Sequence, residues 1–462
     1  MAKPNIIYIH THDTGRFIQP YGHAIPTPNL QKMAENGTLF RQCFNAAPTC
    51  SPSRSALLTG QYPHQCGMLG LAHRGFALND YSHHLASYLA RNGYETALSG
   101  VQHEAPFERR DELGYTRFLT DEPFDADLAR ARLAARGWKG HEIQGGMHTI
   151  GDRAKVPAVV RFLREKHDKP FFLSFGMVST HRMFPKADAD INPNYLKPPA
   201  PIHDNPDTRT DIAEYATMAR CVDDCVGEVL RTLEETGLDR ETFVFFTTDH
   251  GIAFPKMKCN LYDSGIGVAL IVQRPDNPTA GTAVDALVSH VDLYPTLCEV
   301  AGLPRPEWAE GASIVPLLDG TADKVRDEIF SEVTYHAAYE PMRCIRTDRY
   351  KYIRYYDDDM DQVVKPKIDD GYSKQFLMRN GLLEAGHDPK EMLFDLYFDP
   401  AERENRVDHP GYQDVRTELA ARLESWMTQT DDPLLNGPVP KPEGARINKK
   451  RGLQPSDADW EE

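Results

Sequence analysis

The run Phe243-Val244-Phe245-Phe246-Thr247-Thr248-Asp249-His250 places two ionisable side chains directly after an unbroken apolar stretch. A continuous apolar run of this length is typical of a strand that is buried on both faces of a parallel sheet. In such sheets, ligands bind beyond the carboxyl ends of the strands. The run therefore predicts a central strand that delivers Asp249 and His250 to a functional rim.

Shorter stretches of the same kind recur along the first three quarters of the chain. Apolar runs at 6–9, 95–98 and 171–175 alternate with segments of helical periodicity. This alternation predicts an α/β fold with a large, mostly parallel central sheet flanked by helices. The helices are expected at Asn29–Asn36, Ser53–Leu58, Leu85–Asn92, Pro157–Glu165 and Asp211–Glu235.

The pattern changes after residue 330. Arg343–Tyr355 alternates apolar and charged residues around a turn, as half-exposed antiparallel strands do. A helix is expected at Gln413–Thr428, before a charged, proline-rich tail from Asp431 that either wraps the surface or is partly disordered. We expect a catalytic α/β domain of residues 1–330 and a C-terminal subdomain of residues 331–462 with an antiparallel sheet, a helix and an extended tail.

Composition excludes several classes of function. The 462 residues include 52 Lys and Arg against 68 Asp and Glu, a net charge of −16 that disfavours nucleic-acid binding. No run approaches the about 18 apolar residues of a membrane span, and the N-terminus is too short and too polar for a signal peptide. Eight sparse cysteines fit reduced thiols. We expect a cytoplasmic protein without nucleic-acid or membrane partners, and a homo-oligomer stays open.

Ionisable residues follow four of the predicted strands. His12 and Asp13 follow the first strand, and Asp249 and His250 follow the last; His103 and His181 follow the two others. The carboxyl ends of parallel strands meet at one edge, so these side chains are expected to gather there. Asp13, Asp249 and His250 suit a divalent cation, with His12 as an optional fourth ligand.

The segment Cys50-Ser51-Pro52-Ser53-Arg54 is the second candidate for chemistry. It stands at the start of an expected helix. A cysteine at a helix N-terminus with an arginine four residues later is expected to have a lowered pKa and to be nucleophilic. Physical chemistry alone thus predicts an activated cysteine at position 50.

The same segment, with Leu57-Leu58-Thr59-Gly60, resembles the signature of the type I sulfatases. In that family, a dedicated maturation enzyme oxidises the cysteine to 3-oxoalanine (formylglycine). The resemblance implies an alkaline-phosphatase-superfamily α/β sandwich with a smaller C-terminal antiparallel sheet, and one divalent metal ion, usually calcium. It extends to Pro26–Leu30, Gly37–Phe40, Thr248–Gly251 and Leu396–Asn405.

Three further segments resemble the N-sulfoglucosamine sulfohydrolase (sulfamidase) branch of that family: Gln65–Leu71, Asn260–Tyr262 and Tyr339–Arg343. This resemblance implies hydrolysis of a sulfamate or sulfate ester on a small sulfated sugar, with another sulfate ester left open. Because long polysaccharides rarely reach the cytosol, a mono- or disaccharide is expected.

Residue roles follow from the resemblance. The aldehyde made from Cys50 would be the nucleophile, and Arg54 would hold its hydroxyl group. Lys258 would neutralise charge on the sulfate group, His181 would protonate the leaving group, and His103 would take a proton from the nucleophile so that sulfate is expelled. The implied metal ligands are His12, Asp13, Cys50, Asp249 and His250.

The chain departs from the family pattern at two positions. His12 stands where the family usually has a first Asp, which makes calcium less secure and raises manganese or zinc as alternatives. Val101 replaces the usual Lys before His103, so a cation must come from elsewhere; Lys256, Arg182 and Arg74 are the candidates. The residues expected to contact substrate are His73, Arg74, Glu332, His336 and Arg343.

Two other functions stay open. A phosphonate monoester hydrolase or phosphodiesterase could use the same fold, and its substrate would also carry a single negative charge. A protein that binds sulfated ligands without turning them over is the third alternative, suggested by His12 and Val101.

Overall fold

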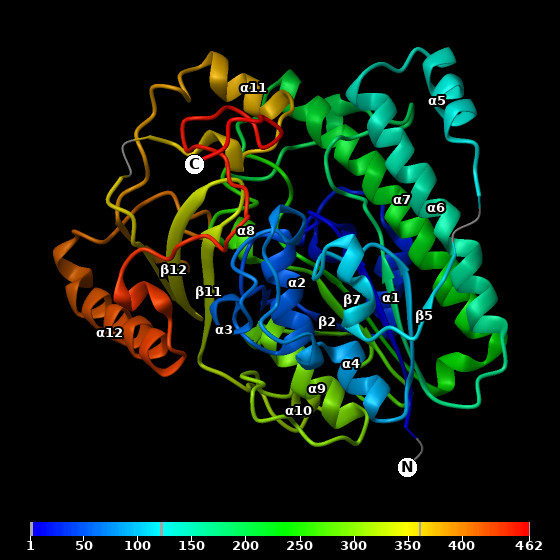
Figure 1. The fold of residues 1–462 in the computed structure, drawn as a ribbon. Helices are drawn as coiled ribbons and strands as arrows, with labels where there is room; N and C mark the ends of the chain where they lie inside the picture. Colours follow the sequence, from blue (N-terminus) through cyan, green and yellow to red (C-terminus); the bar gives the residue numbers. More distant parts are fainter. Residues whose placement is uncertain (1–2, 121–122, 360–361, 462) are drawn as a thin grey trace.

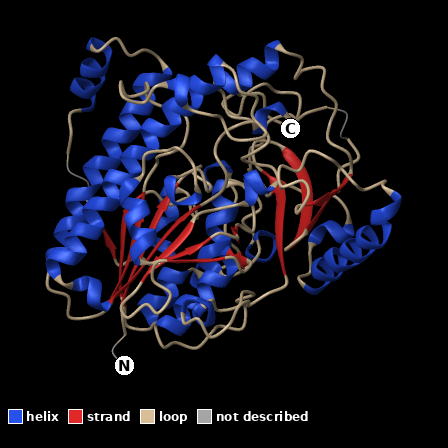
Figure 2. Cartoon of the chain, turned by 180° about the vertical axis from the view of Figure 1, so that it is seen from behind, coloured by secondary structure: helices blue, strands red, loops and turns tan. Residues whose placement is uncertain are grey.

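The computed structural model describes residues 3–120, 123–359 and 362–461. An eight-stranded sheet in the order β5-β4-β6-β1-β7-β8-β2-β9 forms its centre (Figure 2). Strand β1 (Asn5–Thr11) lies in the middle, parallel to β6 (Phe171–Gly176) on one side and to β7 (Thr242–Thr248) on the other. Both neighbours end level with β1, so their following loops meet at one edge.

The outer strands complete a mostly parallel sheet. On one side β4 (Glu95–Gly100) and β5 (Arg117–Phe118) continue the parallel order. On the other side β8 (Leu270–Gln273) is antiparallel to both of its neighbours, β7 and β2. The prediction of a large, mostly parallel sheet is therefore confirmed. Strands β2 (Thr38–Phe40) and β9 (Thr282–Val284) complete this edge of the sheet. Strands β3 (Cys43–Phe44) and β10 (Val288–Ser289) form a separate two-stranded pair.

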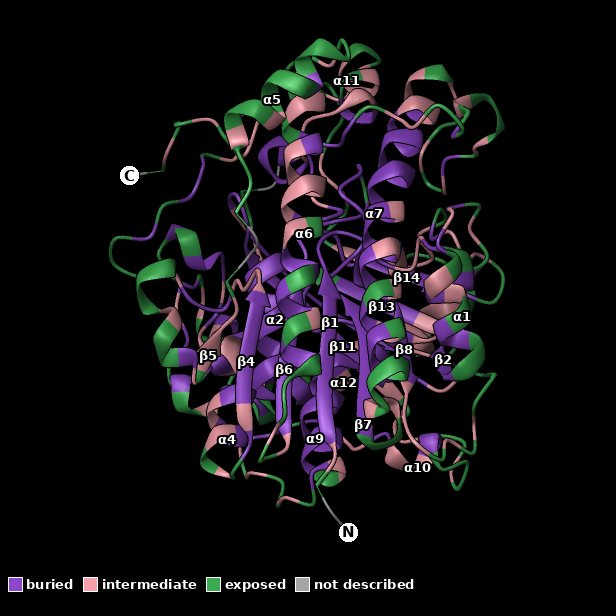
Figure 3. Ribbon diagram, turned by 90° about the vertical axis from the view of Figure 1, so that its right-hand side faces the viewer, coloured by how far each residue is buried: buried purple, intermediate pink, exposed green. Residues whose placement is uncertain are grey.

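Helices cover both faces of this sheet because its strands are apolar on both faces. Alternate residues of β1 show this: Ile7 and Ile9 pack in one core with α1, α6 and α7, and Ile6 and Tyr8 pack in another with α2, α4 and α9. Figure 3 shows the buried strands behind α6 and α7. The bounds are α1 Pro28–Asn36, α2 Cys50–Thr59, α4 Leu85–Arg91, α6 His141–Arg164, α7 Pro206–Thr236 and α9 Leu293–Val300.

The largest difference from a predicted helix boundary is at the start of α6. We expected a helix to start at Pro157, whereas α6 starts at His141 and holds Pro157 in its interior. The first half of α6 contains Gly145, Gly146 and Gly151, a residue type that weakens an isolated helix. They serve close packing instead, because a Cβ at Gly145 would lie 2.1 Å from the backbone of Phe184.

The C-terminal part forms a second, antiparallel sheet of β11 (Glu328–Tyr335), β12 (Tyr339–Thr347), β13 (Tyr350–Tyr355) and β14 (Glu391–Asp395), as predicted. Helix α12 (Gln413–Gln429) packs on it, with Trp426 stacked on Phe330 at a centroid distance of 4.7 Å (Figure 1). The predicted division at residue 330 falls within β11. The remaining helices are α3 Pro63–Cys66, α5 Ala126–Ala135, α8 Asp263–Ile266, α10 Val315–Leu318 and α11 Tyr372–Arg379.

Of the two alternatives for the tail beyond Asp431, the structure shows the wrapped one. Arg74, which lies between β3 and β4 in the sequence, donates hydrogen bonds to Asn448 Oδ1 at 2.7 Å and to the carbonyl of Ala337 at 3.2 Å. The backbone N–H of Arg446 donates in return to the carbonyl of Arg74 at 2.9 Å. Within the described ranges, no helix combines the length and the apolar character that a bilayer crossing needs.

A buried ionic network joins α3, the second sheet and the tail. The guanidinium of Arg343 contacts Asp432 at 2.6 Å and Glu332 at 3.5 Å, and Glu332 contacts His64 Nδ1 at 2.5 Å. Arg343 and the Asp432 side chain are fully buried. Removing one partner of such a network leaves an uncompensated charge in the interior.

We predict that Arg343→Met destabilises the protein by about 3–5 kcal/mol, because Glu332 and Asp432 lose their shared cation. Arg164→Met is the matched control, since Arg164 pairs with Glu235 on the exposed face of α6 and such pairs contribute about 0–1 kcal/mol. The urea midpoint of each variant gives the comparison. Equal midpoints for the two variants would contradict this assignment.

Candidate active site

The loops after four strands of the central sheet bring the predicted site residues together. His12 and Asp13 follow β1, His103 follows β4, His181 follows β6, and Asp249 and His250 follow β7. The ring centroid of His12 lies 4.4 Å from that of His103 and 5.7 Å from that of His181. The N-terminus of α2 brings Cys50 to the same place, with Sγ 3.4 Å from His250 Nε2.

The carboxylate of Asp249 is the centre of this cluster. Its Oδ1 accepts hydrogen bonds from the backbone N–H groups of Asp13 at 2.8 Å and His250 at 2.9 Å. Its Oδ2 lies 3.0 Å from Arg54 and 3.3 Å from His12 Nδ1. Burial works to raise the pKa of Asp249, but His250, Arg54 and His12 hold it well below its usual value. Asp249 is therefore a buried, ionised carboxylate.

The imidazole of His250 faces two carboxylates. Its Nδ1 lies 3.0 Å from the carbonyl of Gly251, an acceptor only, so Nδ1 carries the hydrogen. Its Nε2 lies 3.3 Å from Asp13 Oδ1 and 3.6 Å from Asp249 Oδ2. Since a neutral ring presents a lone pair there, a cation, either a proton or a metal ion, is needed between these atoms.

The donor set fits a divalent metal ion. One ligand atom from each of His12, Asp13, Cys50 and Asp249 lies within 4.8 Å of every other. Asp13 Oδ1 is buried and accepts no hydrogen bond from any residue that the structure describes. A buried carboxylate oxygen without a donor is costly unless a cation occupies the space that it faces.

Cys50 differs from the sequence-based expectation of a low pKa. It is 4% exposed, and every residue of α2 is buried. Burial raises the pKa of the Cys50 thiol despite the nearby charge of Lys258. The lowered pKa predicted from the helix N-terminus is therefore wrong, because burial outweighs the nearby charges of Lys258 and Arg54.

Arg54 is fixed by acceptors on three sides. It donates to His10 Nδ1, to the carbonyl of Thr11 at 2.8 Å and to Asp249. Its Nε is buried and has no acceptor among the described residues. We did not single out His10 from the sequence, although it lies two residues before His12 and therefore on the same side of β1.

Lys258 bridges two carboxylates. Its Nζ lies 2.9 Å from Asp13 Oδ2 and 3.0 Å from Asp369 Oδ2. Burial acts against its charge, but the two carboxylates hold the pKa of Lys258 well above its usual value. Asp369 was missed in the sequence because it lies far along the chain, in a segment without a motif.

The two histidines implied as proton carriers occupy different environments. His181 Nδ1 lies 2.5 Å from the carbonyl of Arg182, which leaves Nε2 at 4.0 Å from Asp13 Oδ2. A third of the His181 side chain is exposed. Burial, followed by the charge of Arg54, lowers the pKa of His103 well below its usual value. His103 is therefore neutral, with a lone pair on one ring nitrogen.

The residues expected to contact substrate divide into two groups. Arg74, Glu332 and Arg343 are buried in the tail contacts and the ionic network described above, so their polar groups already have protein partners. His73 is exposed, with its ring centroid 6.4 Å from that of His103. His336 is buried, and its Nδ1 has no partner in the described part of the chain. We retain only His73 and His336 as candidates for substrate contact.

Val101 stands where the family usually has a lysine. The three residues proposed to supply that positive charge do not present an unpaired charge to the cluster. Arg182 makes two hydrogen bonds to Asp211, at 2.7 and 2.8 Å, and Arg74 is held by the tail. Lys256 is exposed and lines a hollow beside Tyr262. Among the described residues, Arg54 and Lys258 therefore supply the positive charge that contacts the carboxylates of the cluster.

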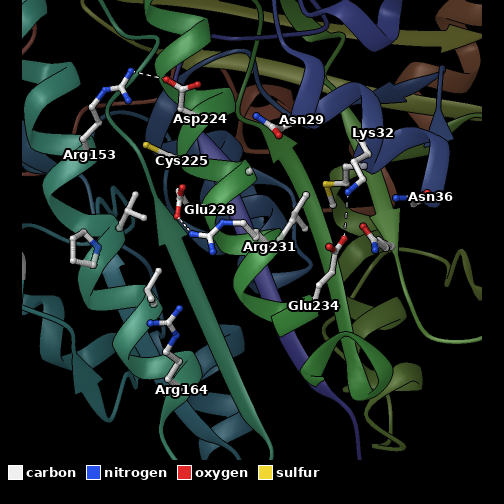
Figure 4. Close-up of a pocket in the computed structure, with 17 residues that line it drawn as sticks. Asn29, Lys32, Asn36, Arg153, Arg164, Asp224, Cys225, Glu228, Arg231 and Glu234 are labelled. Carbon is white, nitrogen blue, oxygen red and sulfur yellow. Dashed lines mark hydrogen bonds and ion pairs between the residues drawn. The ribbon is translucent and has the colours of Figure 1, made fainter. Parts of the chain in front are cut away.

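A hollow of about 960 Å³ lies elsewhere, between α1, α6 and α7 (Figure 4). Its charged side chains pair with one another: Arg153 contacts Asp224 at 2.7 Å, and Lys32 contacts Glu234 at 3.6 Å. It holds none of the residues that form the cluster around Asp249. This hollow is therefore separate from the strand-end cluster.

Comparison with known proteins agrees with the site. The family model described as "Sulfatase" matches residues 4–303, more than half of the chain, and "N-sulphoglucosamine sulphohydrolase, C-terminal" matches residues 251–370. The human N-sulphoglucosamine sulphohydrolase is 28% identical, with 95% of this chain and 92% of that protein covered. An "Ulvan-active sulfatase" of Formosa agariphila is 27% identical, with 97% and 78% covered.

Solved structures share the fold. One described as "a 2-O GAG sulfatase" superposes with a TM-score of 0.70 at 22% identity, with 94% of each chain covered. The phosphonate monoester hydrolase of Agrobacterium radiobacter superposes with a TM-score of 0.70 at 21% identity, with 95% of this chain and 100% of that chain covered. The family models, the cluster at the strand ends and the shared architecture agree, and the chain belongs to the sulfatase family, a family of sulfuric ester hydrolases.

Proposed function

We propose that this protein removes the sulfate group from a small sulfated sugar, as a sulfate ester or an N-sulfoglucosamine-like sulfamate, with formylglycine at residue 50. The observation that carries the proposal is the position of Cys50, whose sulfur lies 3.4 Å from His250 inside the cluster around Asp249. The match to the C-terminal model of the N-sulphoglucosamine sulphohydrolases supports the sugar sulfamate as substrate class.

The metal ion that family membership implies would be held by Asp13, Asp249, His250 and residue 50, with His12 beside them. When bound, it supplies positive charge that draws electron density from the sulfate oxygens. Calcium is the ion expected from the family, and His12 makes manganese or zinc the alternatives.

The protein's own residues prepare the nucleophile. The contacts of Arg54 with His10, Thr11 and Asp249 fix its guanidinium, and its unpaired Nε offers a donor to an oxygen on residue 50. Neutral, half-buried His103 takes a proton from residue 50 so that sulfate leaves and the aldehyde reforms. A second hydroxyl on residue 50 makes this release chemically available, which a serine would not.

His181 and Lys258 act on the leaving group and on the sulfate oxygens. Because Nδ1 of His181 donates to the carbonyl of Arg182, His181 acts in its doubly protonated form, giving its Nε2 proton to the leaving nitrogen or oxygen. Lys258 offsets the charge that develops on the sulfate oxygens. The maturation enzyme that oxidises Cys50 is the protein partner that this mechanism requires.

A phosphonate monoester hydrolase or phosphodiesterase is the second candidate. Its specific support is His12, which replaces one carboxylate of the family's metal motif, together with the fold shared with the Agrobacterium enzyme. Paired kinetics on N-sulfoglucosamine, an aryl sulfate, a phenylphosphonate ester and a phosphodiester separate the two. We expect kcat/KM for the better sulfur substrate to exceed that for either phosphorus substrate by at least about tenfold. Equal or faster turnover of a phosphorus substrate would reject the leading proposal.

We predict that His181→Ala lowers kcat for a sugar sulfamate by about 10²–10⁴, because the amine leaves poorly without a proton. An aryl sulfate with a good leaving group needs little protonation, so its kcat falls much less. His83→Ala, which removes an imidazole stacked on Trp308 outside the cluster, leaves both rates unchanged. Equal losses on both substrates would refute the role of His181 as general acid.

We predict that Asp13→Asn weakens metal binding by at least about 100-fold, because the substitution removes a carboxylate that would bind the metal ion directly. Metal content after equilibrium dialysis, measured by mass spectrometry, gives the affinity without reference to activity. Asp190→Asn changes an exposed carboxylate and serves as the control. Unchanged metal content in Asp13→Asn would overturn the ligand assignment.

A further inference from the structure

We propose that the thiol form of this protein, before Cys50 is oxidised, binds a thiophilic divalent ion of the zinc class through His12, Cys50 and His103. The chemical state of residue 50 would then select the metal: a soft ion for the thiol, a hard ion for the aldehyde hydrate. This proposal does not rest on the sulfohydrolase activity, because it concerns the chain before the nucleophile exists.

The three side chains already converge. One ligand atom from each of His12, Cys50 and His103 lies within 4.8 Å of the other two, and the two imidazole centroids are 4.4 Å apart. A tetrahedral zinc ion, with bonds of about 2.0–2.3 Å, needs its ligand atoms about 3.5 Å apart. Side-chain movements of about 1.3 Å or less therefore close the site.

Two ring nitrogens of this group are buried without a hydrogen bond. Nδ1 of His103 has no partner among the described residues, and Nδ1 of His12 makes no hydrogen bond, although it lies 3.3 Å from Asp249 Oδ2. His12 is 1% exposed and Cys50 is 4% exposed, so water satisfies these groups poorly. Buried polar atoms without partners are uncommon, and metal coordination is one way to satisfy them.

The ligand chemistry separates this group from the carboxylate site beside it. One thiolate and two imidazoles form a soft to borderline set that prefers zinc or cobalt over calcium. Asp13 and Asp249 form a hard set that shares His12 and residue 50. When Cys50 becomes an aldehyde hydrate, sulfur is replaced by oxygen, and the soft set loses its strongest ligand.

Binding to the thiol form is a proton-for-metal exchange. A metal–sulfur bond forms at Cys50 Sγ while the S–H bond breaks, and the proton passes to solvent with no change in oxidation state. Three protein ligands leave the fourth tetrahedral position to water, as in open zinc sites. Sulfur capped in this way is unavailable to an oxidant, so bound zinc holds the chain in its unmatured form.

Cobalt reports such a site directly, because a cobalt–thiolate bond absorbs in the near ultraviolet. The test titrates Co²⁺ into the metal-free, full-length thiol form made in cells that lack the maturation enzyme, with the state of residue 50 checked by mass spectrometry. We expect one Co²⁺ per chain with the thiolate band, and displacement of that band by Zn²⁺. The matured form should show no band.

Variants assign the ligands. Cys50→Ala should abolish the band, and both His103→Ala and His103→Gln should weaken Co²⁺ binding by at least about tenfold. Cys66→Ala removes another buried thiol and should leave the titration unchanged. Circular dichroism shows that each variant is folded. No band in the thiol form, or a band that survives Cys50→Ala, would overturn the proposal, whatever the protein hydrolyses.

Discussion

The buried carboxylate of Asp249 is the constraint on which the site depends. It accepts hydrogen bonds from the loop after β1, from its own loop after β7 and from Arg54 of α2. Its backbone carbonyl adds a 2.6 Å hydrogen bond from Ser53 Oγ. A charge in the interior is tolerated only when donors compensate it. The contacts that keep Asp249 ionised therefore also hold together the loop after β1, the loop after β7 and helix α2.

These contacts hold the side chains of the cluster in position without a bound ligand. Arg54 is held by acceptors from β1 and β7, and residue 50 is held by a helix whose residues are all buried. Lys258 lies between Asp13 and Asp369, so much of its charge is already balanced. A site with few uncompensated cations suits a sulfate ester or sulfamate, which carries one negative charge, better than a phosphate monoester with two.

The fold was predictable because apolar strands and amphipathic helices report burial locally. The runs that end at His10 and Thr247 gave the central strands, and the alternation within Arg343–Tyr355 gave the antiparallel sheet. Long-range electrostatics was not predictable in this way. The Lys258–Asp369 pair joins distant segments, Arg343 is ion-paired in the interior, and burial reverses the pKa shift expected for Cys50. Such outcomes depend on solvation, which a linear sequence does not record.

The proposed mechanism requires residue 50, once oxidised, to be the nucleophile. The direct measurement is mass spectrometry of the tryptic peptide Gln42–Arg54, with Cys43 in the same peptide as an unmodified reference, across preparations matured to different extents. If residue 50 is the nucleophile, sulfohydrolase activity rises in proportion to the formylglycine fraction at position 50. The activity extrapolates to zero when that fraction is zero. Full activity from a chain whose Cys50 is unmodified would contradict it.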